Sequence, residues 1–305
     1  MVRKTSERVA TSQACLPLRE MYAAAVAMNP RSWDQVEDGF LRAIEGFDAN
    51  VAAGLADQGD QRNGKGDFFN DLLALLLENC AGISIHSRGD VPGFIFPKHM
   101  LDVTYPSTGP VVEFLLEAKA VGTPKHPGSP KQKNLLGRSG SADLPKRIKE
   151  AAFKTIDLKA EYGRLQTKMG QVPQAAPGGN LTTWARTVKP RSYLFVAARI
   201  IGKGDLDATI ALAHSAAQIM DGVGIYCFTP STPDDPASAY ERLPVPRDVD
   251  LAAVLFRACQ DLLGLAAEQD AVAAQAAREG DKGPAKIAAD ILDQAEIEET
   301  EDEEP

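Results

Sequence analysis

One stretch limits what this chain can fold into more than any other. Residues 99–120 read HMLDVTYPSTGPVVEFLLEAKA, two apolar, β-prone runs around a segment with two prolines and a glycine. Such a segment favours a turn, so the stretch predicts two strands of a hairpin. Because side chains alternate between the faces of a strand, Glu117 and Lys119 share one face of the second strand. Charged groups on so apolar a strand cost desolvation free energy unless they are paired or bind an ion, which indicates a functional site.

Asp102 on the first predicted strand supplies a second carboxylate. Two carboxylates can hold Mg²⁺ and leave coordination positions open for water and a phosphate oxygen. We therefore predict a metal site made by Asp102, Glu117 and the backbone carbonyl of Ala118, with Mn²⁺ as a possible substitute for Mg²⁺. Lys119 beside it is predicted to orient or help deprotonate the attacking water and to stabilise charge in the transition state. The chemistry that fits is metal-assisted hydrolysis of a phosphodiester.

These residues resemble the PD-(D/E)XK nuclease superfamily, whose motif is an acid on one strand followed by Glu-X-Lys on the next. Here the motif stands as Asp102 and then Glu117-Ala118-Lys119, with Leu101 where the family often has proline. The resemblance implies an α/β, restriction-endonuclease-like fold: a mixed central sheet flanked by helices, with an α-β-β-β-α-β core and helical additions at both ends. It also implies an acid near the end of the helix before the sheet. We assign that catalytic role to Glu78, with Asp71 as the alternative.

The rest of the chain predicts an order of elements that agrees with this core. We expect a chain break at 63–66, a polar loop at 87–92, a long loop at 122–144 and turns at 229–247. A nearly continuous apolar run predicts a central strand covered on both faces at 192–201. The other expected strands are 83–86 and 222–228, and the expected helices are 6–28, 32–57, 67–79, 145–169, 205–220 and 250–278.

The charge distribution favours a polyanionic substrate in spite of the net charge of −9. Residues 291–305 carry −8 of that charge, so the remainder is nearly neutral. Residues 118–168 hold twelve Lys or Arg against four Asp or Glu, beginning at the predicted site. A basic segment beside a carboxylate pair predicts double-stranded DNA as the partner. The predicted phosphate contacts are Lys125, Lys131, Lys133, Arg138, Lys146 and Arg147.

The cysteines and the hydropathy indicate the expected compartment. The four cysteines have no paired spacing and stand in apolar patterns, so we predict buried thiols rather than disulfides or zinc ligands. No apolar run of about 18 residues is present, and the first residues lead into no signal-peptide core. The expectation is a soluble cytoplasmic protein without a membrane partner.

Together these predictions divide the chain into a helical region at 1–62, a nuclease core at 63–230, a second helical region at 231–290 and a disordered acidic tail at 291–305. The function they favour is a Mg²⁺-dependent DNA endonuclease of the Type II restriction kind. One motif set per chain and two strands to cut favour a homodimer or a higher homo-oligomer. The alternatives are a repair, recombination or phage-defence nuclease, or a non-catalytic nucleic-acid-binding or protein-interaction module. Carboxylates on opposite faces of the sheet would favour such a module; carboxylates that converge on one cation-sized gap would favour the nuclease.

Overall fold

The structure of the protein is a computed structural model that describes residues 12–106, 112–125, 137–168, 180–232 and 238–299, with side chains up to residue 275. The chain divides into two compact units, Met1–Leu262 and Leu263–Pro305. The first unit contains the whole sheet and every site discussed below. In the part of the chain that was searched, no helix combines the length and the apolar character needed to cross a lipid bilayer.

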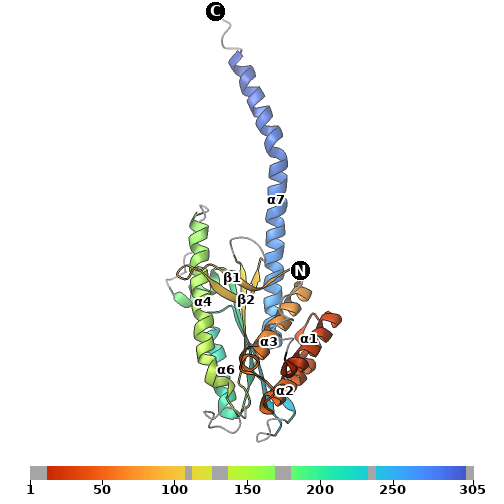
Figure 1. Ribbon diagram of the computed structural model, residues 1–305. Helices are drawn as coiled ribbons and strands as arrows, with labels where there is room; N and C mark the ends of the chain where they lie inside the picture. The colour runs from red at the N-terminus through yellow and green to blue at the C-terminus, as the bar shows by residue number, and fades with distance from the viewer. Residues whose placement is uncertain (1–11, 107–111, 126–136, 169–179, 233–237, 300–305) are drawn as a thin grey trace, which may run out of the picture. The chain divides into compact units, whose positions relative to one another are not determined.

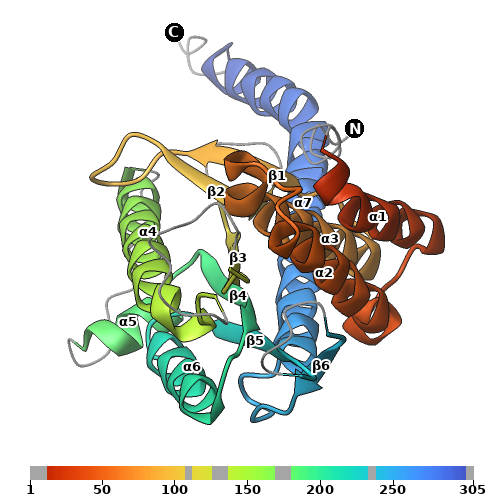
Figure 2. The same cartoon turned by 60° about the horizontal axis from the view of Figure 1, so that its bottom comes forward.

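The described residues of the first unit form one six-stranded mixed sheet in which the strands lie side by side in chain order. Figure 1 labels β1 and β2, and Figure 2 labels all six strands. β1, β2 and β3 pair antiparallel, β3, β4 and β5 pair parallel, and β6 returns antiparallel to β5. The predicted α/β class and the predicted hairpin are both confirmed. The strands are β1 (His86–Val91), β2 (His99–Tyr105), β3 (Phe114–Val121), β4 (Arg191–Arg199), β5 (Gly222–Pro230) and β6 (Tyr240–Leu243).

Helices cover both faces of the sheet (Figure 2). One face carries α4 and α6, which pack on each other and on β3, β4 and β5. The other face carries α3, against which α1 and α2 pack. The helices are α1 (Leu16–Met28), α2 (Glu37–Ala52), α3 (Gln58–Ala81), α4 (Gly140–Lys168), α5 (Leu181–Thr187), α6 (Lys203–Ala216) and α7 (Leu251–Glu299), with short 3₁₀ turns at Gln13–Cys15 and Trp33–Gln35.

The alternation along β4 and β5 divides the core between these two layers. Leu194, Val196 and Ala198 pack under α4 and α6 together with apolar residues of β5. On the opposite face, aromatic rings meet edge to face: the Tyr226 ring lies 5.3 Å from that of Trp33 and 5.5 Å from that of Phe40. β4 is buried along nearly its whole length, as its continuous hydrophobicity predicts.

Helix α3 contradicts the break predicted at residues 63–66. Asp57, and not Asp67, caps its N-terminus by accepting the N–H of Asp60, and the helix continues without interruption to Ala81. Gly64 suits this close packing of the two helices, because a Cβ there would lie 3.1 Å from the Phe47 ring, a tight contact that the ring would have to relieve by a few tenths of an ångström. Packing thus outweighs the poor intrinsic helix propensity of glycine, which costs only about 1 kcal/mol.

Lys65, next to that glycine, is buried at the end of a polar network. Its ammonium lies 3.0 Å from Asp48 Oδ1 and donates to the Gly122 carbonyl at 2.7 Å. Asp48 Oδ2 also accepts the hydroxyl of Tyr240 at 2.7 Å. Burial lowers the pKa of Lys65, although the Asp48 carboxylate opposes the shift. The ion pair joins α2 and α3 to the end of β3.

We expect Lys65→Ala to destabilise the fold strongly. The substitution leaves the Asp48 carboxylate buried without its counter-charge, which typically costs about 3–5 kcal/mol of unfolding free energy. Urea unfolding followed by circular dichroism measures the loss, and Lys203→Ala, which removes an exposed lysine of α6, is the matched control. Equal unfolding midpoints for the two variants would show that the Lys65 ion pair does not hold the helical layer.

Other boundaries also differ from the predictions. The first strand lies at His86–Val91 and shares only His86 with the strand predicted at 83–86; the rest falls in the predicted loop, because it pairs with β2 in spite of its polar sequence. Helix α4 begins at Gly140, with Pro145 inside its first turns, and β6 lies in the segment predicted to be turns. Helix α7 runs to Glu299, whereas the sequence predicts disorder from residue 291. Cys80 and Cys259 form a disulfide, which corrects the prediction of four thiols; Cys15 and Cys227 are free and buried.

Candidate active site

The predicted metal site lies where strands β2 and β3 separate. Their ladder ends at the pair Val103 and Leu116, and the same register continued by one residue sets Asp102 opposite Glu117. At this point a side-chain hydrogen bond replaces the backbone ladder: Asp102 Oδ2 accepts the backbone N–H of Ala118 at 2.8 Å. The carboxylate is thus fixed against the second strand by the strand's own backbone.

Both carboxylates point at one ammonium group. Lys119 Nζ lies 2.8 Å from Asp102 Oδ2 and 2.6 Å from Glu117 Oε2. The parallel pairing of Glu117 with Leu194, which packs under α4 and α6, sets this cluster on the α4 side of the sheet. The two predicted acids therefore lie on one face of the sheet and converge on the Lys119 ammonium, which fills the position between them.

Burial and charge together fix the protonation of Lys119. The Glu117 side chain is almost completely buried, with 1% of its residue surface exposed, whereas Asp102 and Lys119 are partly exposed. Burial alone would lower the pKa of the Lys119 ammonium, but the Asp102 and Glu117 carboxylates outweigh it and raise the pKa. Lys119 is therefore protonated at neutral pH in this arrangement. In that state it can donate hydrogen bonds and stabilise negative charge, but it cannot accept a proton.

Lys154 of α4 completes the cluster, and the sequence did not identify it. Its Nζ donates to Glu117 Oε1 at 2.8 Å and to the Met100 carbonyl at 2.7 Å. Helical periodicity predicts that Lys154 and Lys159 point outward, but Lys159 is also buried, donating to the carbonyls of Val188 and Pro190 at 2.6 Å. A long aliphatic stem lets a lysine reach inward from the edge of an apolar stripe, and no spacing rule marks such a residue.

The donor set fits a Mg²⁺ ion. Mg²⁺ is usually bound by one or two carboxylates, with waters and substrate phosphates completing its coordination. Glu117 Oε2 is buried 2.6 Å from the Lys119 ammonium, which is its cationic partner in this structure. A Mg²⁺ ion would share this oxygen with the ammonium or displace it. Ala118 contributes its N–H to the cluster through Asp102, and the role of its carbonyl stays a prediction.

The structure does not bring the predicted helix acid into this group. Glu78 lies near the end of α3, the helix of the opposite layer, and its Oε1 accepts the N–H of Ile85 at 3.4 Å. Asp71, the alternative, lies 3.7 Å from Arg88 of β1. Among the described residues no group of three or more Asp, Glu, His or Cys side chains is placed to hold a metal ion. The acids that converge are therefore Asp102 and Glu117.

We expect Lys154→Met to change the metal dependence of any activity at this site. The Lys154 ammonium neutralises Glu117 Oε1, so its removal leaves a more negative site that attracts a divalent cation more strongly. The concentration of Mg²⁺ that gives half-maximal cleavage should fall several-fold, and the maximal rate should also fall because Glu117 loses its alignment. Lys149→Met, which removes an exposed lysine five residues earlier, should leave the half-saturating Mg²⁺ concentration unchanged.

The structure describes four of the six predicted DNA contacts. Lys125 follows β3, while Lys131 and Lys133 lie outside the described residues. Arg138 pairs with Asp143, and Glu150 lies 3.8 Å from Lys146 and 3.0 Å from Arg147. These exposed cations would have to exchange a carboxylate for a phosphate, which is a small cost at the surface.

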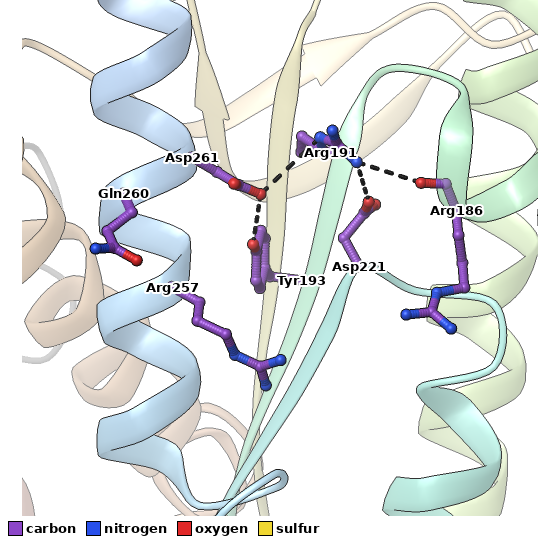
Figure 3. A pocket seen from close by; sticks show the side chains of 7 residues that line it. All are labelled: Arg186, Arg191, Tyr193, Asp221, Arg257, Gln260 and Asp261. Carbon is purple, nitrogen blue, oxygen red and sulfur yellow. Dashed lines mark hydrogen bonds and ion pairs between the residues drawn. The ribbon is translucent and has the colours of Figure 1, made fainter.

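A pocket of about 380 Å³ lies apart from this cluster, near the first residues of β4 and β5 (Figure 3). Inside it, Arg191 binds Asp221 at 2.9 Å and the Tyr193 hydroxyl donates to Asp261 at 2.7 Å. Three arginines face two aspartates in its lining, and none of the predicted site residues lines it. The lining residues are Arg186, Arg191, Tyr193, Asp221, Arg257, Gln260 and Asp261.

No family model, no curated protein and no solved structure matches this chain. What the site can do therefore has to be worked out from its own side chains.

Proposed function

We propose that this protein is a Mg²⁺-dependent endonuclease that hydrolyses phosphodiester bonds in double-stranded DNA. The observation that supports it best is the convergence of the Asp102 and Glu117 carboxylates on one cation, the Lys119 ammonium, at distances of 2.8 and 2.6 Å. Two carboxylates and a lysine at the fork of two strands suit phosphodiester hydrolysis better than they suit a structural role, since one of them is an almost completely buried glutamate.

Each side chain has a distinct task in this proposal. Asp102 and Glu117 would hold the cation, with the Ala118 carbonyl as a further ligand. Mg²⁺, when bound, supplies Lewis-acid stabilisation of the phosphate charge and acidifies water. The Lys119 ammonium donates a hydrogen bond to a lone pair of the attacking water and so orients the water. It also donates to the phosphate oxygens as negative charge develops on them. Lys154 holds Glu117 Oε1 and so fixes the direction of the carboxylate.

The finer points of the proposal are the restriction-endonuclease-like fold, a Type II restriction role, a homodimer or higher homo-oligomer and a cytoplasmic location. The order α3-β1-β2-β3-α4-α5-β4 supports the fold, because apart from the short helix α5 it follows the α-β-β-β-α-β core of the superfamily that the Asp102 and Glu117-Ala118-Lys119 motif resembles. A repair, recombination or phage-defence nuclease would use the same cluster. Each chain has one such cluster among its described residues, so a two-fold symmetric dimer would supply one cluster for each of the two opposed DNA strands.

The second candidate is a non-catalytic nucleic-acid-binding module. It is favoured by the charge balance of the cluster, in which two ammonium groups face two carboxylates. Incubation of the protein with supercoiled plasmid in Mg²⁺ or in EDTA separates the two. We expect nicked and linear plasmid with Mg²⁺ and none with EDTA. Shifted but intact plasmid under both conditions would favour the binding module.

We also expect Lys149→Gln to reduce the salt dependence of DNA binding. Lys149 is exposed on α4, and within the described residues it has no acidic partner, so it can contact a phosphate directly. Loss of one such contact should reduce the slope of log K against log salt by about 0.9. Arg31→Gln, which removes an exposed cation ahead of α2, is the charge-matched control. Equal slopes for the two variants would remove this face of α4 from the DNA interface.

A further inference from the structure

An exposed apolar patch lies beside the Lys154–Glu117 ion pair. It is formed by the loop between β1 and β2, the start of β2 and α4, which lie next to each other (Figure 2). Its side chains are 45% to 66% exposed, which is unusual for so many large apolar groups in one place. The members of this patch are Phe94, Ile95, Phe96, Met100 and Phe153.

The loop that presents the patch is held rigidly. Buried Asp157 of α4 accepts the N–H groups of Ile95 at 2.8 Å and Phe96 at 3.3 Å, and it pairs with His99 at 2.7 Å. The residue at 93 must be glycine, because a Cβ there would lie 2.1 Å from Asp157 Oδ2. Burial would raise the pKa of Asp157, but the hydrogen bonds from His99 and from the two N–H groups lower it, so the carboxylate stays charged near neutral pH. A buried ionic anchor thus fixes aromatic side chains in contact with solvent.

Lys154 connects the apolar patch to the candidate active site. Lys154 Nζ bonds both to the Met100 carbonyl and to Glu117 Oε1, and Phe153 is its neighbour in α4. The ring centroids of Phe96 and Phe153 lie 5.4 Å apart, and they lie 5.9 and 6.1 Å from the ring centroid of His99. Exposed Lys149 stands one helical turn from Phe153. Aromatic rings bordered by cations are the composition of surfaces that stack unpaired bases while lysines follow the backbone.

We propose that Phe96 and Phe153 form a stacking platform for unpaired bases of the DNA whose scissile phosphate lies at Glu117 and Lys119. The substrate would then be DNA with a single-stranded or locally opened segment next to the cut. This inference rests on the proposed function for the choice of DNA as the ligand. Charge complementarity selects this occupant: lysines border the patch, and the site it adjoins is built for a phosphodiester.

The test compares two labelled duplexes, one fully paired and one with a central four-nucleotide mismatched bubble, by fluorescence anisotropy in EDTA. The full-length protein should bind the bubble more tightly. The double variant Phe96→Leu, Phe153→Leu keeps apolar side chains but loses the rings, and we expect about a tenfold loss for the bubble and little change for the paired duplex. Phe256→Leu, which removes an exposed ring of α7, should change neither affinity.

A second measurement uses the fluorescence of 2-aminopurine placed in the bubble. Stacking on a ring quenches its fluorescence, so wild type should quench it on binding and the double variant should not. Equal affinities of wild type and the double variant for the bubble would overturn the proposal, as would an equal loss for both duplexes. A change of oligomeric state in the double variant, with DNA binding unchanged, would assign the patch to a subunit interface and overturn it too. Cleavage of either duplex by wild type after addition of Mg²⁺ tests the proposed function separately, whatever the outcome for the rings.

Discussion

Asp102→Asn should bind DNA and fail to cut it. The amide keeps an oxygen that can accept the Ala118 N–H, so the strand fork should stay intact, but it removes the charge that Mg²⁺ requires. Loss of several kcal/mol of stabilisation of the transition state corresponds to a cleavage rate lower by about 10³-fold. Single-turnover cleavage of a labelled duplex at saturating protein measures this rate, and anisotropy measures the affinity.

The control for this variant is Asp207→Asn, which neutralises an exposed carboxylate of α6 and should cut like wild type. DNA affinity of Asp102→Asn should be equal to that of wild type or somewhat higher, because a negative charge is removed near the phosphate. Undiminished cleavage by Asp102→Asn in Mg²⁺ would refute the assignment of Asp102 as a metal ligand.

Lys119→Met should have a similarly large effect, with a loss of about 10²–10³-fold in the single-turnover rate, as expected for a group that stabilises charge in a site shielded from water. Its affinity for DNA should change by less than tenfold. Lys149→Met is the matched control, because it should weaken binding and leave the rate at saturation unchanged.

The raised pKa of Lys119 also fixes the expected pH dependence. A lysine whose pKa lies above its usual value of about 10.4 is fully charged below that pH, and the stabilisation from its ion pairs is lost only as the pH rises through the raised pKa. Between pH 6 and 9 the cleavage rate should therefore show no titration of Lys119. Lys119→Arg, which keeps a charge, should recover more activity than Lys119→Met. Equal inactivity of the two variants would instead favour a proton-accepting role for the lysine.

The strand fork could be predicted from the sequence because its signals are local. The alternation that sets Glu117 and Lys119 on one face needs only neighbouring residues, and the turn between the strands is signalled by its prolines and glycine. The structure places Glu117 and Lys119 together, pairs β2 antiparallel with β3, and adds the distance that joins Asp102 to the same ammonium group, whereas residues 107–111 of the predicted turn lie outside the described residues.

The rest depends on contacts between distant parts of the chain. Helix α3 passes through Gly64 because Phe47 packs against it, which no propensity scale contains. Lys154 and Glu117 are in contact although they are 37 positions apart in the sequence, and Cys80 and Cys259 are paired although they are 179 positions apart. Such pairs have no spacing signal, since only the packing of helices on the sheet brings them together.

In the proposed function the Asp102 and Glu117 carboxylates act together to let the chain cut DNA with Mg²⁺. Single-turnover cleavage of one labelled duplex in Mg²⁺ by wild type and by Glu117→Gln, prepared side by side and shown to be folded by circular dichroism, tests this joint role. We expect wild type to cut the duplex and Glu117→Gln to cut it about 10³-fold more slowly. Equal rates, or no cleavage by wild type, would contradict this joint role.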